Sequence, residues 1–314
     1  MIQASPAISI CIPAYKRVDS LKRLLASIAI QTFKDFEVVI TDDSPDDSVQ
    51  ILAGTFKEKF PLKYFKNNAV LGTPANWNAS IDQASGEWIK IMHDDDWFAH
   101  EDSLAAFAAK MNDTDKFIFC DYQSIDEENK VQKKSFISNA WKKRITHEPY
   151  TLYAKNMIGP PSATLIHKSI MEKFDTQLKW LVDIDFYISI LSKEKKMIHI
   201  NEPLICIGLS ASQVTNACFL NPKVELPEGL RMLEKNGLNK LKNIWVYDAW
   251  WRLFRNMHIQ HEAELEKYVT RKWPLVLVSI LKDQKKYAPV LLKNGVISKS
   301  LMYLSFKKNA PGIY

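Results

Sequence analysis

Residues 87–97 read EWIKIMHDDDW, a short apolar segment that ends in His93 and three consecutive carboxylates. The segment predicts a buried strand over Glu87–Met92. Three adjacent carboxylates repel one another, so placing them at a strand end is costly unless a cation neutralises them. Such hard oxygen ligands suit Mg²⁺ or Mn²⁺. A solvated acidic turn is the alternative, and zinc is disfavoured because no second histidine lies at ligand spacing.

The residues around this motif alternate between strand and helix patterns. Apolar runs predict strands at Ala7–Pro13, Phe36–Thr41 and Leu62–Lys66, and helical spacing predicts helices near 21–28, 48–60 and 74–84. Strands separated by helices indicate βαβ units and a mostly parallel sheet. Because ligands bind beyond the carboxyl ends of such strands, we expect the site in the loops Pro13–Asp19, Asp42–Asp47 and His93–Trp97.

The pattern loosens after residue 102. Gly159–Ser162 (GPPS) predicts a rigid turn, and beyond Val224 only helical patterns remain. Between them we expect strands at Phe117–Asp121, Ala163–His167 and His199–Leu209, a polar hairpin or loop at Asp126–Lys134, and a helix at Trp180–Ser192.

Charge is distributed unevenly along the 314 residues. Residues 1–216 hold 25 basic and 28 acidic side chains, whereas residues 217–314 hold 17 basic and 8 acidic ones, for a net charge of +6. A content of 46% apolar and 25% charged residues excludes a disordered or fibrous chain. The asymmetry indicates two parts, the second facing an anionic partner. No nucleic-acid recognition motif is present, so an anionic membrane surface or another subunit is the expected partner.

The basic region interleaves lysines with aromatic and aliphatic residues, and two hypotheses explain this pattern. Trp245, Trp250, Trp251, Trp273 and Leu275–Leu281 beside lysines suit helices that lie at an anionic membrane surface. Alternatively, these side chains pack on the rest of the chain or on a second copy in a homo-oligomer, and the lysines are merely solvated.

The sequence also favours a cellular location. No apolar run approaches the ~20 residues that span a bilayer, and the N-terminal MIQASPAISI has no basic n-region of a secretory signal. The four cysteines are widely spaced, which favours a reducing compartment over a disulfide framework or a metal cluster. We therefore expect a cytoplasmic protein, with the inner face of the cytoplasmic membrane as the candidate peripheral site.

Two further pairs of carboxylates are candidates for chemistry. Asp42 and Asp43 end a predicted strand and could bind base or ribose groups, although DDSPDD is also ordinary turn sequence. Asp183 and Asp185 lie two residues apart on a predicted helix and so point in different directions. At most one of them faces a shared cleft, with Asp183 the candidate general base and Asp185 a cap or structural partner.

Taken together, these motifs resemble one family in order and spacing. IPAYKR, QTFKDFEVVITDDS and NNAVLGTPANWNASIDQASGEWIKIMHDDDW resemble the nucleotide-sugar-binding half of a family 2 (GT-A fold) glycosyltransferase. GPPSATLIHKSIMEKF, VDIDF and INEPLICIGLSASQVTN resemble its acceptor half. The resemblance implies an α/β, Rossmann-like catalytic domain over 1–216, with halves 1–100 and 101–216. A helical basic region follows over 217–314.

The resemblance also assigns site residues. It implies that Asp183 is the catalytic base, with Val182 where the family has Glu, and that Asp95 and the outer-shell Asp96 hold Mn²⁺ or Mg²⁺. His93 occupies the place of the family's first Asp. The nucleotide-sugar-binding positions implied are Pro13, Ala14, Tyr15, Asp43, Asn76 and Asp94.

The function implied is inverting transfer of a sugar from a nucleotide-diphosphate donor, such as a UDP- or GDP-sugar, to an acceptor hydroxyl. The expected acceptor is a glycan or glycolipid of cell-surface biosynthesis. Two other classes stay open. A nucleotidyltransferase would want a Gly/Lys/Arg-rich phosphate loop after the first strand, which IPAYKRVDS lacks. A non-catalytic carbohydrate-binding or scaffold protein would share the fold without turnover.

Overall fold

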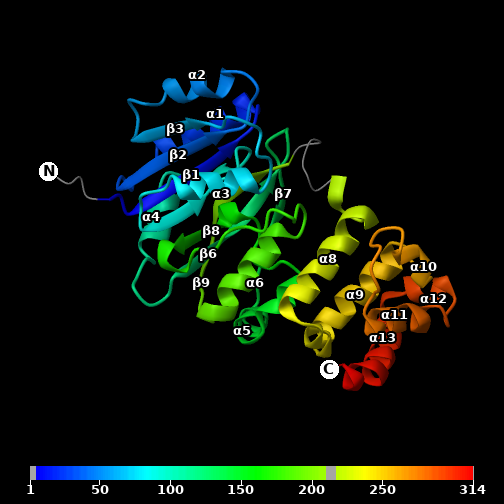
Figure 1. The fold of residues 1–314 in the computed structure, drawn as a ribbon. Helices are drawn as coiled ribbons and strands as arrows, with labels where there is room; N and C mark the ends of the chain where they lie inside the picture. Colours follow the sequence, from blue (N-terminus) through cyan, green and yellow to red (C-terminus); the bar gives the residue numbers. More distant parts are fainter. Residues whose placement is uncertain (1–4, 210–216, 314) are drawn as a thin grey trace. The chain divides into compact units, whose positions relative to one another are not determined.

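The structure is a computed structural model that describes residues 5–209 and 217–313. Its contacts divide the chain into two compact units (Figure 1). Unit 1 consists of Met1–His147, Met157–Thr176 and Phe186–Ser212, and unit 2 of Glu148–Asn156, Gln177–Asp185 and Gln213–Tyr314.

Unit 1 is built on one mixed sheet with the strand order β3-β2-β1-β4-β8-β6-β9-β5, and β7 pairs with β6. The strands are β1 (Ile8–Ala14), β2 (Phe36–Asp42), β3 (Leu62–Lys66), β4 (Trp88–Ile91), β5 (Trp97–Phe98), β6 (Phe117–Ile125), β7 (Val131–Lys134), β8 (Thr164–His167) and β9 (Ile198–Gly208). The helices that accompany them are α1 (Val18–Ala29), α2 (Ser48–Gly54), α3 (Ala75–Asp82), α4 (Ser103–Ala108) and α5 (Asn139–His147).

The first half of the sheet has the predicted parallel arrangement. β3, β2, β1 and β4 are all parallel, as the alternation of strands and helices implied. The second half differs, because β8 runs antiparallel to both β4 and β6, and β5 runs antiparallel to β9. The α/β fold class is confirmed, and the antiparallel pairs are a feature that the local sequence did not indicate.

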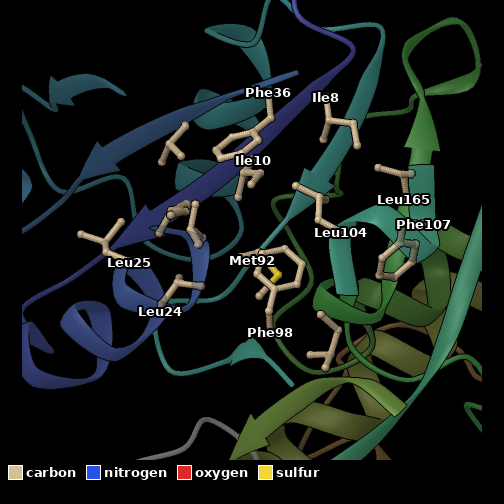
Figure 2. Packing of buried hydrophobic residues seen from close by; sticks show 14 of the residues in the cluster. Ile8, Ile10, Leu24, Leu25, Phe36, Met92, Phe98, Leu104, Phe107 and Leu165 are labelled. Carbon is tan, nitrogen blue, oxygen red and sulfur yellow. The ribbon is translucent and has the colours of Figure 1, made fainter. Parts of the chain in front are cut away.

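The core of unit 1 lies between this sheet and its helices. Leu24 and Leu25 of α1 point toward the side chains of β1 and β2, and Phe107 of α4 lies near Leu165 of β8 (Figure 2). Every residue of β1 is buried, which explains its continuous apolar sequence ISICIPA. Such a strand is held rigidly, so the loop that follows it starts from a fixed point.

Unit 2 is helical and has its own aromatic core. Trp250, Trp251 and Trp273 are fully buried, and Trp250 packs on Tyr153 at 5.7 Å between ring centroids. These three tryptophans therefore serve packing, not a membrane surface. The helices that lie wholly in unit 2 are α8 (Pro222–Asn236), α9 (Ile244–Asn256), α10 (Glu262–Leu265), α11 (Leu275–Gln284), α12 (Pro289–Lys293) and α13 (Gly295–Asn309).

The helices of the basic C-terminal region share unit 2 with residues 148–156 and 177–185. Helix α6 (Val182–Glu194) begins in unit 2 and continues in unit 1. The predicted boundary at 216/217, and the end of the predicted acceptor motif, fall at residues 210–216, outside the described residues. In the described part of the chain, no helix has the length and apolar composition needed to cross a bilayer.

Candidate active site

Three loops meet at the carboxyl edge of the parallel strands. Because β1 pairs with β2 and β4 in parallel register, the segments that follow all three strands emerge at one edge. The Tyr15 N–H donates to Asp94 Oδ2 at 3.2 Å, and the Lys16 N–H donates to Ser44 Oγ at 2.8 Å. The three loops selected from the sequence are thus joined by hydrogen bonds at one place.

Arg17 neutralises two of the three adjacent carboxylates. Its Nη1 lies 2.6 Å from Asp95 Oδ2 and 3.3 Å from Asp94 Oδ1. Burial, followed by repulsion from Asp95, raises the pKa of Asp94 to about 7, and the Arg17 charge opposes this rise. Asp94 is therefore poised between its charged and neutral forms, and its state depends on the cations beside it.

Asp96 is the most deeply buried of the three carboxylates, with 2% of its surface exposed. Its Oδ1 accepts from the Gly208 N–H at 3.3 Å. Burial and repulsion from Asp95 raise its pKa well above the ordinary value. Hydrogen bonds from Ser162 and Gly208 and the charge of Lys90 oppose this rise, and a carboxylate buried in this way favours either a proton or a nearby cation.

His93, Asp95 and Asp96 fit a divalent metal ion. One ligand atom from each lies within 4.8 Å of the others. Within the described residues, the buried His93 Nε2 and Asp96 Oδ2 have no hydrogen-bond partner, although His93 Nδ1 lies 3.7 Å from Asp96 Oδ2. Burial lowers the pKa of His93 to about 4, so the imidazole is neutral and can act as a ligand. One nitrogen and two carboxylates are a donor set that suits Mn²⁺.

A buried lysine lies in β4, the strand that precedes these carboxylates. Lys90 of β4 is fully buried and donates through Nζ to the backbone oxygen of Ser162, in the predicted Gly159–Ser162 turn. Burial lowers its pKa to about 7. The same Ser162 accepts from the His93 N–H through Oγ at 3.0 Å. Ser162 therefore ties the turn to both the strand and the acidic loop.

Gly208 allows β9 to approach the acidic loop closely. A Cβ at this position would lie 2.4 Å from the backbone oxygen of Asp95, closer than side chains tolerate. Arg23 donates to that same oxygen at 3.3 Å, and its guanidinium lies 3.6 Å from the Trp97 ring centroid. Glycine is thus needed here for close packing.

Asp43 holds a loop through backbone contacts. Its carboxylate accepts from Asn67 Nδ2 at 2.8 Å, from the Gly72 N–H at 2.8 Å and from the Leu71 N–H at 3.1 Å. Three acceptor sites are therefore filled, and a carboxylate has about four. The neighbouring Asp42 is fully buried and accepts from Tyr64 at 2.7 Å, which makes it a structural group.

Asn76, Pro13 and Ala14 lie beneath the exposed residues of the site. The Asn76 amide donates to the backbone oxygens of Thr41 at 3.1 Å and Ala14 at 3.4 Å. Pro13 and Ala14 are buried within β1. Tyr15, by contrast, is 46% exposed. Of these four positions, Tyr15 has the side chain free to contact a bound molecule.

Asp183 and Asp185 belong to unit 2 and have different surroundings there. Asp183 accepts from Asn156 Nδ2 at 2.9 Å, and burial raises its pKa to about 7. Asp185 is 2% exposed and accepts from Lys235 Nζ at 2.6 Å. A carboxylate with a pKa near neutrality suits a general base, whereas one paired with lysine suits a structural contact.

Sequence reasoning missed Arg17, Lys90 and Gly208. Arg17 lies in the IPAYKR segment, within a loop predicted to bind the ligand, so its position could have indicated a role in the site. Lys90 was the one charged residue inside an apolar strand, which also signals a special environment. Gly208 gave no such signal, because its importance comes from the pairing of β6 with β9.

Comparisons with known proteins agree on one family. The family described as Glycosyl transferase family 2 matches residues 9–175. A GalNAc(5)-diNAcBac-PP-undecaprenol beta-1,3-glucosyltransferase of Campylobacter jejuni is 38% identical over 93 residues, 29% of this chain and 30% of that protein. An uncharacterised glycosyltransferase of Rickettsia typhi is 25% identical over 224 residues, 68% of each chain. Abequosyltransferase RfbV of Salmonella typhimurium is 34% identical over 118 residues, 36% of this chain and 35% of that protein. The matched segments thus span about a third of the Campylobacter and Salmonella relatives.

Solved structures share the fold at low sequence identity. TarS 1–349 of S. aureus in complex with UDP-GlcNAc has a TM-score of 0.66 and 17% identity, covering 98% of this chain and 92% of that one. The mannosyltransferase PcManGT of Pyrobaculum calidifontis, in complex with GDP-Man and Mn²⁺, has a TM-score of 0.52 and 13% identity, covering 98% and 88%.

Proposed function

Because the chain belongs to glycosyl transferase family 2, we propose that it moves a sugar from a nucleotide-diphosphate donor to an acceptor hydroxyl with inversion at the anomeric carbon. One observation carries the proposal: Tyr15, Arg17, Asp94 and Asp95 meet where β1 and β4 end. This edge offers an exposed aromatic ring for a base, a cation for phosphates, and carboxylates for ribose hydroxyls and a metal ion.

The donor is proposed to be a UDP- or GDP-sugar. TarS was solved with UDP-GlcNAc and PcManGT with GDP-Man, which supports this class of ligand. Tyr15 and Asp43 would contact the base, with Pro13 and Ala14 shaping that wall. Asp94 would accept from a ribose hydroxyl, and Asn76 would support the loop beneath the diphosphate. Asp43 retains about one acceptor site for this purpose.

The metal ion is proposed to bind through Asp95 and Asp96, with His93 as a further ligand. Mn²⁺ or Mg²⁺ in this position would supply positive charge for the departing diphosphate. His93 replaces a carboxylate of the usual family motif, and its neutral imidazole makes the site softer and less negative. Mn²⁺ is therefore the ion that we expect to serve best.

The chemical step is proposed to use Asp183 as the general base. The acceptor oxygen forms a bond to the anomeric carbon while the bond from that carbon to the diphosphate oxygen breaks. The Asp183 carboxylate takes the hydroxyl proton, and the nucleoside diphosphate leaves with the bonding electrons. A positioned base of this kind contributes about 10²–10⁴ in rate. Asn156, which donates to Asp183 Oδ2, would orient it.

The acceptor is proposed to be a glycan or a lipid-linked glycan of cell-surface biosynthesis. The Campylobacter relative is named for an undecaprenol-linked substrate, which supports a membrane-linked acceptor. The excess of basic over acidic residues in 217–314, 17 against 8, supports peripheral binding at an anionic inner membrane face.

The proposal is tested by nucleotide release from a panel of UDP- and GDP-sugars with Mn²⁺, using the full chain and its Asp183→Asn variant. We expect release with one nucleotide class, and its loss in the variant. Binding of a donor without any release, for every donor and acceptor tried, would favour a carbohydrate-binding or scaffold protein. Formation of a nucleotide-sugar from a sugar phosphate and a nucleoside triphosphate would instead identify a nucleotidyltransferase.

A further inference from the structure

Unit 2 contains a cavity of about 150 Å³ that the proposed reaction does not use. Its walls come from α9, α11 and α12 and from the segment 258–260, and its buried residues are Phe254, Ile259 and Gln284. The volume is well above the ~10–15 Å³ that a single water needs. The cavity can therefore hold a group larger than a water molecule.

The lining of the cavity is basic. Arg255, Lys285 and Lys293 supply positive charge to it, His258 also lines it, and none of the described residues in its lining is a carboxylate. Arg255 donates through Nη1 to Ser298 Oγ at 3.0 Å, and Lys285 Nζ lies 3.4 Å from His261 Nδ1. Across residues 5–209 and 217–313, neither lysine nor Arg255 forms an ion pair with an acidic side chain. Such a concentration of cations with neutral partners favours an anionic ligand, above all a phosphate group.

Helix α13, which contacts the cavity lining through Ser298, also carries an exposed apolar face. Ser298, the partner of Arg255, lies on the buried side of α13 together with Met302 and Ser305. Val296, Tyr303 and Leu304 follow the i, i+7, i+8 spacing of one helix face and are 79%, 45% and 60% exposed. Unlike an ordinary surface helix, α13 thus carries apolar residues on its outer face as well.

Helix α12 combines the two features. Pro289, Leu292 and Lys293 line the cavity, while Val290 on the same helix is 71% exposed. α10 to α13 lie close together at the C-terminal end of the chain (Figure 1). Exposed apolar residues beside a basic cavity form an amphipathic surface, which we call the α12–α13 surface (Val290, Lys293, Val296, Tyr303, Leu304).

We infer that the α12–α13 surface docks on a bilayer that contains anionic phospholipid. The phosphate headgroup of one lipid occupies the basic cavity, and the exposed apolar side chains enter the headgroup boundary beside it. A second copy of the chain is disfavoured as the occupant, because two surfaces with the same positive charge repel each other. The inference rests on the proposed function only for its setting, a membrane-linked acceptor.

The test is co-sedimentation of the full chain with vesicles of phosphatidylcholine alone or mixed equally with phosphatidylglycerol. We expect binding to the mixed vesicles at low salt, weaker binding at high salt, and little binding to phosphatidylcholine. The Lys285→Glu/Lys293→Glu variant should bind at least about 30-fold more weakly, since losing each basic residue near headgroups costs about five-fold and each new carboxylate adds repulsion. Val296→Ser/Leu304→Ser should also weaken binding, but without changing its salt dependence.

Matched controls make the test specific. Lys267 and Lys282 are exposed in unit 2 but do not line the cavity, so Lys267→Glu/Lys282→Glu changes the net charge equally and should keep most of the binding. An equal loss in this control would overturn the cavity site in favour of diffuse attraction. Equal binding of the unaltered chain to both vesicle types would contradict the inference that the ligand is an anionic headgroup.

Two other occupants are distinguished by separate measurements. Inorganic phosphate that binds the cavity, with no vesicle binding, would identify a free phosphate ligand and overturn the lipid. If light scattering shows a dimer that dissociates in the Val296→Ser/Leu304→Ser variant, a second copy occupies the surface. That result would also overturn the lipid as the occupant. Vesicle binding is measured without donor or acceptor, and an Asp95→Ala variant should bind vesicles normally. Failure of sugar transfer therefore leaves this result interpretable.

Discussion

Arg17 Nη1 lies 2.6 Å from Asp95 Oδ2, so a cation from the loop after β1 is paired with the carboxylate proposed to bind the metal. The same nitrogen lies 3.3 Å from Asp94 Oδ1. The pairing offsets the repulsion among adjacent carboxylates in the free protein. It also places a positive charge at the edge where a diphosphate would bind, and Arg17 would be a candidate contact for that diphosphate if Asp95 held a metal ion.

The first prediction concerns Asp95. Asp95→Ala removes a carboxylate from the His93, Asp95 and Asp96 group, so it should abolish Mn²⁺-dependent binding of a UDP- or GDP-sugar while the fold is kept. Calorimetric titration of the donor with and without Mn²⁺ measures this effect. Asp113→Ala, at an exposed acidic residue between α4 and β6, is the control and should bind as the unaltered chain does. Undiminished turnover in EDTA would contradict a metal requirement.

The second prediction separates Asp183 from Asp185. Asp183→Asn should keep donor binding but lower the transfer rate by about 10² or more, the usual effect of losing a general base. Asp185→Asn breaks the contact with Lys235 and should lower stability by about 1 kcal/mol, with a smaller effect on rate. Donor affinity, transfer rate and urea unfolding are measured for both variants. A reversal of the two rate effects would move the base to Asp185.

The third prediction is a pH profile. Burial raises the pKa of Asp183 to about 7, and a base must be deprotonated to act. The transfer rate should therefore rise with pH up to about 7 and then level off. A profile that is flat from about pH 5 to 8 would contradict a base with this pKa.

The raised pKa of Asp183 also makes the stability of the fold depend on pH. The unfolded pKa of an aspartate is about 3.9, so between about pH 4 and 7 the folded chain binds more protons at Asp183 than the unfolded chain does. The contribution of Asp183 to the free energy of unfolding is fully present below about pH 4 and is lost as the pH rises through about 7. Asp183→Asn should remove this part of the pH dependence in urea unfolding.

Local sequence predicted the first half of the sheet well. β3 has the predicted bounds, and the ends of β1 and β2 differ by one residue, because buried apolar runs between turn residues mark such strands clearly. Helix α2 is shorter than the predicted 48–60 and ends at Gly54, where the low helix propensity of glycine acts. The antiparallel half was not predictable, since β5 has only two residues and pairs with β9 far along the chain.

The candidate site was predictable to the same degree. The loops after β1, β2 and β4 were selected from the sequence, because parallel strands place their carboxyl ends at one edge. The Arg17 pair joins residues 78 positions apart, so its existence depends on the register of β1 against β4. The burial that raises the pKa of Asp183 likewise arises only in the folded chain and cannot be seen in the VDIDF segment.

The last prediction tests the close approach of β9 to the acidic loop. In Gly208→Ala the new Cβ would lie 2.4 Å from the backbone oxygen of Asp95, so either β9 or the loop must move. Overpacking of this kind costs about 1–3 kcal/mol. Because the Gly208 N–H donates to Asp96 Oδ1, the movement should also weaken Mn²⁺-dependent donor binding.

Gly54→Ala is the matched control, since its Cβ meets no atom within 4 Å and lies in a helix. That control should raise stability by about 0.4–1 kcal/mol and leave donor binding unchanged. Urea unfolding and donor titration of both variants measure the two effects. Normal metal-dependent donor binding by Gly208→Ala would show that the acidic loop does not depend on β9 for its position.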